Sequence, residues 1–217
     1  MIPRLSSRIV NVFIRNRIIE EAEAEIYQYG LEMVLSTAVN ILIVLCCGLV
    51  FGELISAVLF FIMFAWIRSS SGGYHAETYL KCNTIYTINL VIVLFWVKFA
   101  ASYYSLSGHI MFLLIYFLTA AQFAPVENPN KPLEESQKKK HKQLCILYGV
   151  ILSIVSFVLW YGVHQVKYAV LITATMLSVA VAMAVEIFRN GGECNEKDQK
   201  NNVHRIRSRY QCVFCFL

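Results

Sequence analysis

The chain carries a histidine and a cysteine seven residues apart, His75 and Cys82, which are the base and the nucleophile that thiol catalysis needs. An imidazole can take the proton of a thiol and later protonate a leaving amine. Arg68 is the nearest cation before them and would favour the thiolate. Gly72 and Gly73 permit backbone turns that other residues avoid, or a close approach of another chain. The pattern indicates a cysteine peptidase, although an inert interfacial histidine and cysteine would show the same spacing.

The spacing also constrains how the two side chains meet. A straight helix would place them on one face but about 10.5 Å apart along the helix axis. That separation is too large for the hydrogen bond that proton transfer needs. We therefore expect a break, a turn or a re-entrant bend between His75 and Cys82, which is tolerated at membrane depth where protein or water covers the backbone.

The composition indicates an integral membrane protein. Of the 217 residues, 58% are hydrophobic and 15% are charged, and the mean hydropathy is +0.56, whereas a soluble chain has about 25% charged residues. A disordered chain, a collagen and a coiled coil are excluded. The net charge of +5 does not indicate a nucleic acid partner, because the basic residues mark loops between spans. The expected partner is the lipid bilayer, and we expect no cleavable signal peptide.

Six apolar stretches approach the length of about 20 residues that crosses a bilayer. They cover residues 31–51, 53–67, 84–106, 108–124, 144–163 and 166–188. The second is short, because only 14 residues separate Glu53 from Arg68, so Arg68 must lie at depth or the residues after it must help to complete the span. Glu32, Lys98 and Glu186 lie near span ends, where we expect their side chains to reach the interface.

Basic residues define the orientation of an all-α membrane protein with about six transmembrane helices. Seventeen of the 19 lie on one side of the predicted spans, leaving Lys98 and Lys167 on the other, so both termini are expected in the cytoplasm. The predicted parts are an amphipathic interfacial helix (1–28), a polytopic membrane domain (29–188) with a catalytic loop (68–83) and a basic loop (125–143), and a cytoplasmic tail (189–217).

The seven cysteines do not form a disulfide framework, because their number is odd and their positions are scattered. Cys212 and Cys215 form a CxxC pair in the tail, with Cys194 and His204 before them. One such pair with irregular partners is a weak indication of zinc. We therefore expect no metal and no cofactor.

Two separate motifs resemble those of a known family. The first runs through Arg68, Gly73, His75-Ala76 and Cys82, and the second consists of Ala124-Pro125 and Asn130-Lys131-Pro132 ahead of a lysine cluster. Together they resemble the accessory gene regulator B (AgrB) family of bacterial quorum-sensing peptidases. The resemblance is close from the second span to the start of the fifth, and covers the rest in length and hydropathy.

The resemblance implies a cytoplasmic-membrane cysteine endopeptidase that removes the C-terminal tail of a small amphipathic precursor peptide, the D component of the system. The enzyme then cyclises the remainder to a thiolactone or lactone signal, and it is expected to be a homodimer. Cys82 would be the nucleophile and His75 the base, with Arg68 and Gly73 in support. The lysines of the basic loop would attract the acidic tail of the precursor; they are Lys138, Lys139 and Lys140. The group that orients His75 stays open among Glu77, Asn83, Gln122 and Glu127.

Other classes fit the sequence less well. A peptide exporter without protease activity agrees with six spans, but no ATP-binding loop, inverted repeat or pair of broken spans is apparent. A serine peptidase could use Ser69, Ser70 or Ser71 with His75, but no GxSx element accompanies them, and a zinc peptidase would need an HExxH motif.

Overall fold

The computed structural model describes residues 2–72, 79–99, 101–126 and 134–191 of the chain. All regular elements within these ranges are helical, in the order α1 (Ile2–Arg15), η1 (Glu21–Glu23), α2 (Ala24–Phe51), α3 (Leu54–Ser71), α4 (Tyr79–Phe99), η2 (Ala101–Tyr103), α5 (Leu106–Phe123), α6 (Glu135–Phe157), the π-helical turn η3 (Val158–Gly162) and α7 (Val166–Gly191). Six of them, α2 to α7, are long and apolar enough to cross a membrane. The predicted all-α class with six spans is thereby confirmed.

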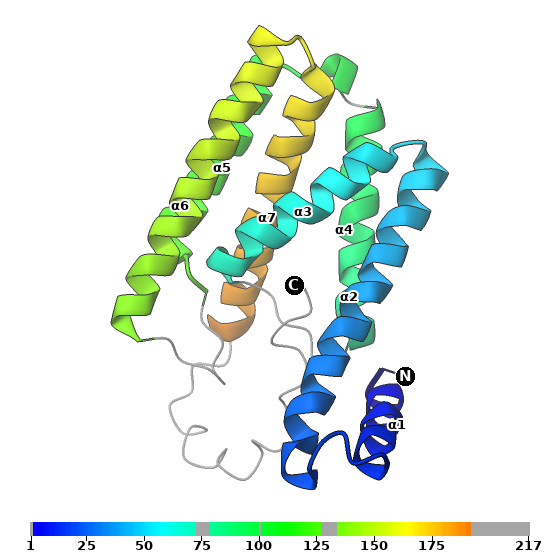
Figure 1. Cartoon of the computed structure of the whole chain (residues 1–217). Coiled ribbons are helices and arrows are strands. Elements are labelled where there is room, and N and C mark those ends of the chain that lie inside the picture. Colours follow the sequence, from blue (N-terminus) through cyan, green and yellow to red (C-terminus); the bar gives the residue numbers. More distant parts are fainter. Residues whose placement is uncertain (1, 73–78, 100, 127–133, 192–217) are drawn as a thin grey trace.

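Helix α7 lies at the centre of the bundle. It packs against α3, α4, α5 and α6, whereas α2 packs at one edge against α3 and α4, and α1 packs against α2 (Figure 1). In the apolar 18-residue core of α7, 61% of the residues are buried, compared with 22% in the corresponding part of α2. Small side chains make this close packing feasible, since helices in a bilayer associate by contact rather than by escape from water. Examples in α7 are Ala169, Thr173 and Thr175, each fully buried.

Successive spans run in opposite directions, so the ends of the bundle differ in chemistry. The starts of α2, α4 and α6 lie at one end with α1 (Figure 1). The α2–α3 turn and the start of α7 lie at the other end. We call the first the α1 end and the second the Glu53 end.

The helices do not keep all the expected boundaries, and the differences in α4 and in the N-terminal helix are the first to note. Helix α4 covers Tyr79–Phe99 rather than 84–106, so Cys82 lies inside a helix and not in a loop. Hydropathy marks the apolar part of a span, and the polar first turn of α4 extends beyond that part. The N-terminal helix ends at Arg15 rather than at residue 28, and Arg17 adopts a positive φ of 55° in a turn that carries neither glycine nor proline to reveal it.

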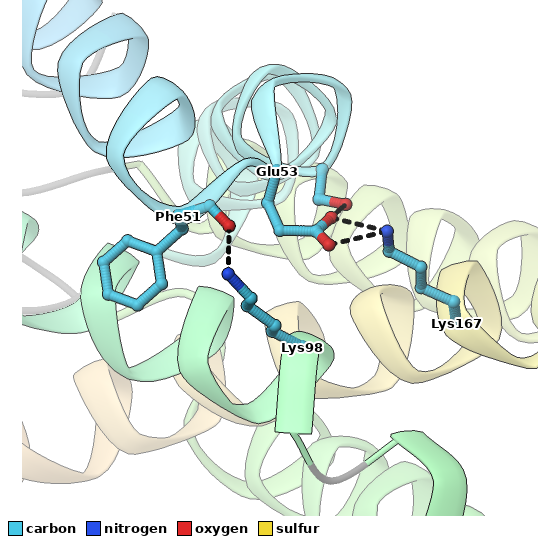
Figure 2. A network of polar contacts seen from close by, with 5 residues as sticks. Phe51, Glu53, Lys98 and Lys167 are labelled. Carbon is cyan, nitrogen blue, oxygen red and sulfur yellow. Dashed lines mark hydrogen bonds and ion pairs between the residues drawn. The ribbon is translucent and has the colours of Figure 1, made fainter.

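An ion pair closes the Glu53 end. The Glu53 carboxylate accepts hydrogen bonds from Lys167 Nζ at 2.7 Å and from Ser56 Oγ at 2.8 Å, and Lys98 Nζ donates to the Phe51 carbonyl at 2.7 Å. Figure 2 shows how both lysines reach toward the α2–α3 turn. The two basic residues that the sequence assigned to this side thus tie the turn to α4 and α7.

This network predicts an acid-sensitive contribution to stability. Burial opposes ionisation of Glu53, but the hydrogen bonds from Lys167 and Ser56 and the nearby positive charges outweigh burial and hold its pKa below the ordinary value of 4.5. A lowered pKa stabilises the folded state above that value, and the contribution is lost as the pH falls through the folded-state pKa.

We expect Glu53→Gln to lower the free energy of unfolding by about 1–2 kcal/mol at neutral pH, between the values for exposed and buried pairs. Thermal unfolding in detergent from pH 7 to pH 3 measures this difference, which should shrink as the pH falls. The exposed Glu25 provides the control variant Glu25→Gln, which should be neutral. An equal effect of the two variants at pH 7 would contradict the role of the ion pair.

Candidate active site

Cys82 faces the interior at the α1 end of the bundle. Its side chain belongs to a stripe along α4 that continues through Tyr86 and Leu90, one helical turn apart, and Cys82 itself is only 3% exposed. The ring of Tyr86 packs against Phe60 and Phe64 of α3, with ring centroids 6.1 and 6.0 Å away. These aromatic contacts fix the rotation of α4, and this rotation turns Cys82 away from lipid.

The other described cysteines occupy less suitable places. Cys46 and Cys47 lie near the Glu53 end of α2 and are exposed and half-buried, respectively. Cys145 is buried in the middle of the bundle, where its thiol contacts the Tyr116 hydroxyl at 3.3 Å. All four described cysteines are free of disulfides, and Cys82 is the one placed at the polar α1 end.

Arg68 lies buried in the last turn of α3, with 8% of its surface exposed. This agrees with the expectation that it lies at depth. Its Nη1 donates a hydrogen bond to the Gly72 carbonyl at 3.1 Å, and a cation at the C-terminal end of a helix also compensates the helix dipole. Helix α3 runs to Ser71, four residues beyond the predicted 53–67 span, because its polar last turn is covered by protein.

The serines before the glycines use their hydroxyl protons on backbone carbonyls. Ser69 Oγ donates to the Trp66 carbonyl at 2.7 Å, and Ser71 Oγ donates to the Gly72 carbonyl at 3.1 Å. A nucleophilic serine instead donates its proton to a base. The geometry of these two serines therefore does not favour the serine peptidase alternative.

The segment after α3 is joined to the segment after α5. Val126 N donates to the Ser71 carbonyl at 2.9 Å, and Gly72 and Val126 form an isolated parallel bridge. The residues are buried, with Ser71 at 0% and Val126 at 9% exposed. The first motif region, from Arg68 to Cys82, and the second, which begins at Ala124, therefore meet through their backbones.

Three polar residues of α2 are also buried at the α1 end. Glu32, Ser36 and Asn40 are 4%, 1% and 2% exposed and lie four residues apart, on the helix that packs against α1 and α4. Glu32 accepts hydrogen bonds from Ser6 of α1 and Gln28 of α2, both at 3.1 Å. Buried polar residues at membrane depth mark functional regions, and the four-residue spacing was the sequence signal that could have identified them.

We expected the side chains of Glu32, Lys98 and Glu186 to reach the interface, and this expectation was wrong for the two glutamates. Glu32 is buried as described, and Glu186 of α7 is 2% exposed. Their distance from a span end gives their depth but not the side of the helix on which they lie. Lys98, by contrast, is exposed and caps α2.

The lysines of the predicted basic loop lie in the first turns of α6. Lys138 is half-buried and pairs with Glu135 at 2.8 Å, while Lys139 and Lys140 are exposed. The helix begins with a reciprocal capping arrangement between Glu134 and Gln137. The part of the 125–143 segment from residue 135 onward is therefore helical, and it presents its positive charges at the α1 end.

Several predicted site residues lie outside the described residues. They are Gly73, His75, Glu77, Glu127 and the tail cysteines. Of the two remaining candidates for orienting His75, Gln122 is exposed on α5, whereas the Asn83 amide oxygen is buried without a hydrogen-bond partner. Among the described residues, no group of three histidine, cysteine, aspartate or glutamate side chains is placed to hold a metal ion.

Away from Cys82, His109 is buried at the Glu53 end. His109 Nε2 lies 3.1 Å from Ser156 Oγ, and its ring packs against Phe157 and Trp160, with centroids 4.9 and 5.0 Å away. Ser156 already donates its proton to the Ser153 carbonyl at 2.8 Å, so His109 is the donor to Ser156. These contacts of His109 are with a serine and aromatic rings, and we assign this histidine to packing.

Comparisons with known proteins agree with the two motifs. The family model "Accessory gene regulator B" matches residues 6–185. An AgrB-like protein of Clostridium perfringens strain 13 is 31% identical over 149 residues, which is 64% of this chain and 69% of the relative. A second, from Halalkalibacterium halodurans, is 27% identical over 188 residues, which is 82% of this chain and 90% of the relative. No solved structure gives a significant match.

Proposed function

Since the chain belongs to the accessory gene regulator B family, we propose that it is a membrane-embedded cysteine endopeptidase of peptide quorum sensing. Cys82 attacks a peptide bond of a small precursor, His75 acts as the base, and the C-terminal tail of the precursor is released. The observation that carries this proposal is the burial of the Cys82 thiol, 3% exposed, at the α1 end of a multi-pass bundle. A nucleophile shielded from water suits acyl transfer better than hydrolysis.

The lysines at the α1 end support an acidic substrate. Lys138, Lys139 and Lys140 follow one another near the start of α6, and Lys139 and Lys140 are exposed. This concentration of positive charge is complementary to an anionic partner. We assign this end to the cytoplasm, where the basic residues of a membrane protein gather and where the precursor is made.

The exposed apolar residues of helix α1 are a further argument for an amphipathic precursor. Only Ser6 and Val10 of this helix are fully buried, and Leu5 and Val12 remain 48% and 52% exposed. An amphipathic helix with uncovered apolar residues lies in the membrane interface. A precursor helix in the same interface would therefore reach the α1 end along the membrane surface.

The lysine cluster provides a test of substrate attraction. Replacing Lys138, Lys139, Lys140 and Lys142 by glutamine is expected to raise KM about tenfold at low ionic strength, since steering by charge changes encounter by about this factor or more. The dependence of KM on salt should also flatten. Lys98→Gln, at the Glu53 end, is the control and should leave KM unchanged. A KM of the fourfold variant equal to that of the wild type at every salt concentration would leave the lysines with a topological role only.

A further inference from the structure

The junction between the segments after α3 and α5 depends on Gly72. This glycine lies between Arg68 and Gly73 but is not one of the residues that carry the resemblance to the family. Gly72 adopts φ +66° and ψ −152°, a combination that is open essentially to glycine alone. An added Cβ would overlap the carbonyl oxygen of Val126. Both the conformation and the contact therefore exclude any side chain at position 72.

Two side chains hold the carbonyl that follows the one bound by Val126. Arg68 Nη1 and Ser71 Oγ each donate to the Gly72 carbonyl at 3.1 Å, while Val126 N donates to the Ser71 carbonyl at 2.9 Å. The two bonds to the Gly72 carbonyl are partly buried, while the neighbouring Ser71 and Ala124 are 0% and 6% exposed. Polar groups removed from water are costly to leave without hydrogen bonds, so the junction has one well-defined arrangement.

We propose that Gly72 and Val126 form a backbone clamp that positions the catalytic segment, and that Arg68 is its brace. This inference rests on the proposed function and assigns positioning roles within it. The clamp lies where the chain leaves α3 toward His75, and on its other side the chain leaves α5 toward the lysines of α6. It therefore fixes the end of α3, after which the chain continues to His75, relative to the end of α5, after which the chain continues to the lysines of α6.

The clamp gives Arg68 a second role beside the one that the sequence favoured. From sequence alone, its charge was expected to stabilise the Cys82 thiolate. The hydrogen bond from Nη1 to the Gly72 carbonyl makes it a positioning residue that acts through the backbone. Through this bond Arg68 is expected to affect the rate of the chemical step.

The chain offers a matched control for a substitution at the clamp. Gly52, in the α2–α3 turn at the Glu53 end, also has a positive φ of 68°, but an added Cβ there would meet nothing within 4 Å. Alanine at either position introduces backbone strain from the positive φ, and this strain is larger at position 72, whose ψ of −152° is open essentially to glycine alone. Only alanine at position 72 also displaces Val126.

The test measures kcat and KM for precursor cleavage with the purified full chain. Gly72→Ala is expected to lower kcat about 100-fold, the loss that a displacement of about 1 Å can cause, with KM changed by less than about twofold. Gly52→Ala is expected to retain the wild-type kcat. If Gly72→Ala does not yield folded protein, Arg68→Gln, which removes the charged donor to the clamp, should show the same loss of kcat at unchanged KM.

Three outcomes separate the clamp from the proposed function. A kcat of Gly72→Ala equal to that of Gly52→Ala, with Cys82→Ala inactive, would overturn the clamp and leave the peptidase intact. A loss confined to thermal stability, with normal kcat in the folded fraction, would also overturn it. Cleavage by Cys82→Ala would instead reject the proposed nucleophile, whatever Gly72→Ala does.

Discussion

Cys82→Ala and His75→Ala are each expected to abolish cleavage of the precursor, with expression and membrane insertion unchanged. Each substitution removes one half of the nucleophile–base unit, and such losses lower a peptidase rate by about 10,000-fold or more. The burial of Cys82 against the bundle also means that neighbouring groups cannot easily replace it. Cleavage of a labelled precursor by membranes that contain each variant measures the effect.

Matched substitutions separate loss of chemistry from loss of fold. Cys145→Ala removes another buried thiol, and His164→Asn changes an exposed histidine with a positive φ of 55°, a conformation that asparagine tolerates. Both variants should cleave at the wild-type rate. Ser71→Ala should have a mild effect, since it leaves the charged donor Arg68 Nη1 on the Gly72 carbonyl. Loss of cleavage in Ser71→Ala, with retention in Cys82→Ala, would identify a serine peptidase instead.

The number of spans and the two motif regions could be predicted from the sequence because each leaves a local signal. Six apolar runs and the clustering of basic residues report the depth of each segment. Depth does not give rotation about the helix axis, so the burial of Glu32 and Glu186 was missed. Likewise, a polar helical turn such as the one around Cys82 looks like a loop when hydropathy alone is considered.

The contact between Gly72 and Val126 could not be predicted for another reason. It joins backbones more than fifty residues apart in sequence, and backbone pairing leaves no pattern of side chains in either segment. The resemblance to the family placed both segments in motifs but did not indicate that they touch. The only trace in the sequence was the pair Gly72-Gly73 before His75. This pair predicts either a backbone turn or a close approach of another chain, but it does not identify the segment that approaches.

The second large effect concerns how the proposed enzyme avoids simple hydrolysis. The Cys82 thiolate attacks the scissile carbonyl, the C–N bond breaks, and the imidazolium of His75 protonates the leaving amine of the tail. The N-terminal part of the precursor is then bound to Cys82 as a thioester. An internal thiol of the precursor attacks this carbonyl, its proton passes to His75, and the Cys82 thiolate is released as the thiolactone closes.

This path retains the activation of the acyl group and needs no ATP. It requires that the internal nucleophile reach the thioester before water does. Both the 3% exposure of Cys82 and its position at a membrane interface favour the internal nucleophile. A precursor whose internal cysteine is replaced by alanine should therefore lose its tail in a single turnover of the enzyme. The truncated precursor should then remain attached to Cys82. An exporter without protease activity would leave the tail in place.

Mass spectrometry of the intact enzyme after incubation with the alanine-substituted precursor tests this account most directly. We expect a mass increase equal to the truncated precursor, located on the peptide that contains Cys82 and removed by neutral hydroxylamine. The wild-type precursor should give a cyclic product and little adduct. Release of the tail at the normal rate without an adduct, and with free linear acid as the product of both precursors, would contradict the account and show a plain hydrolase.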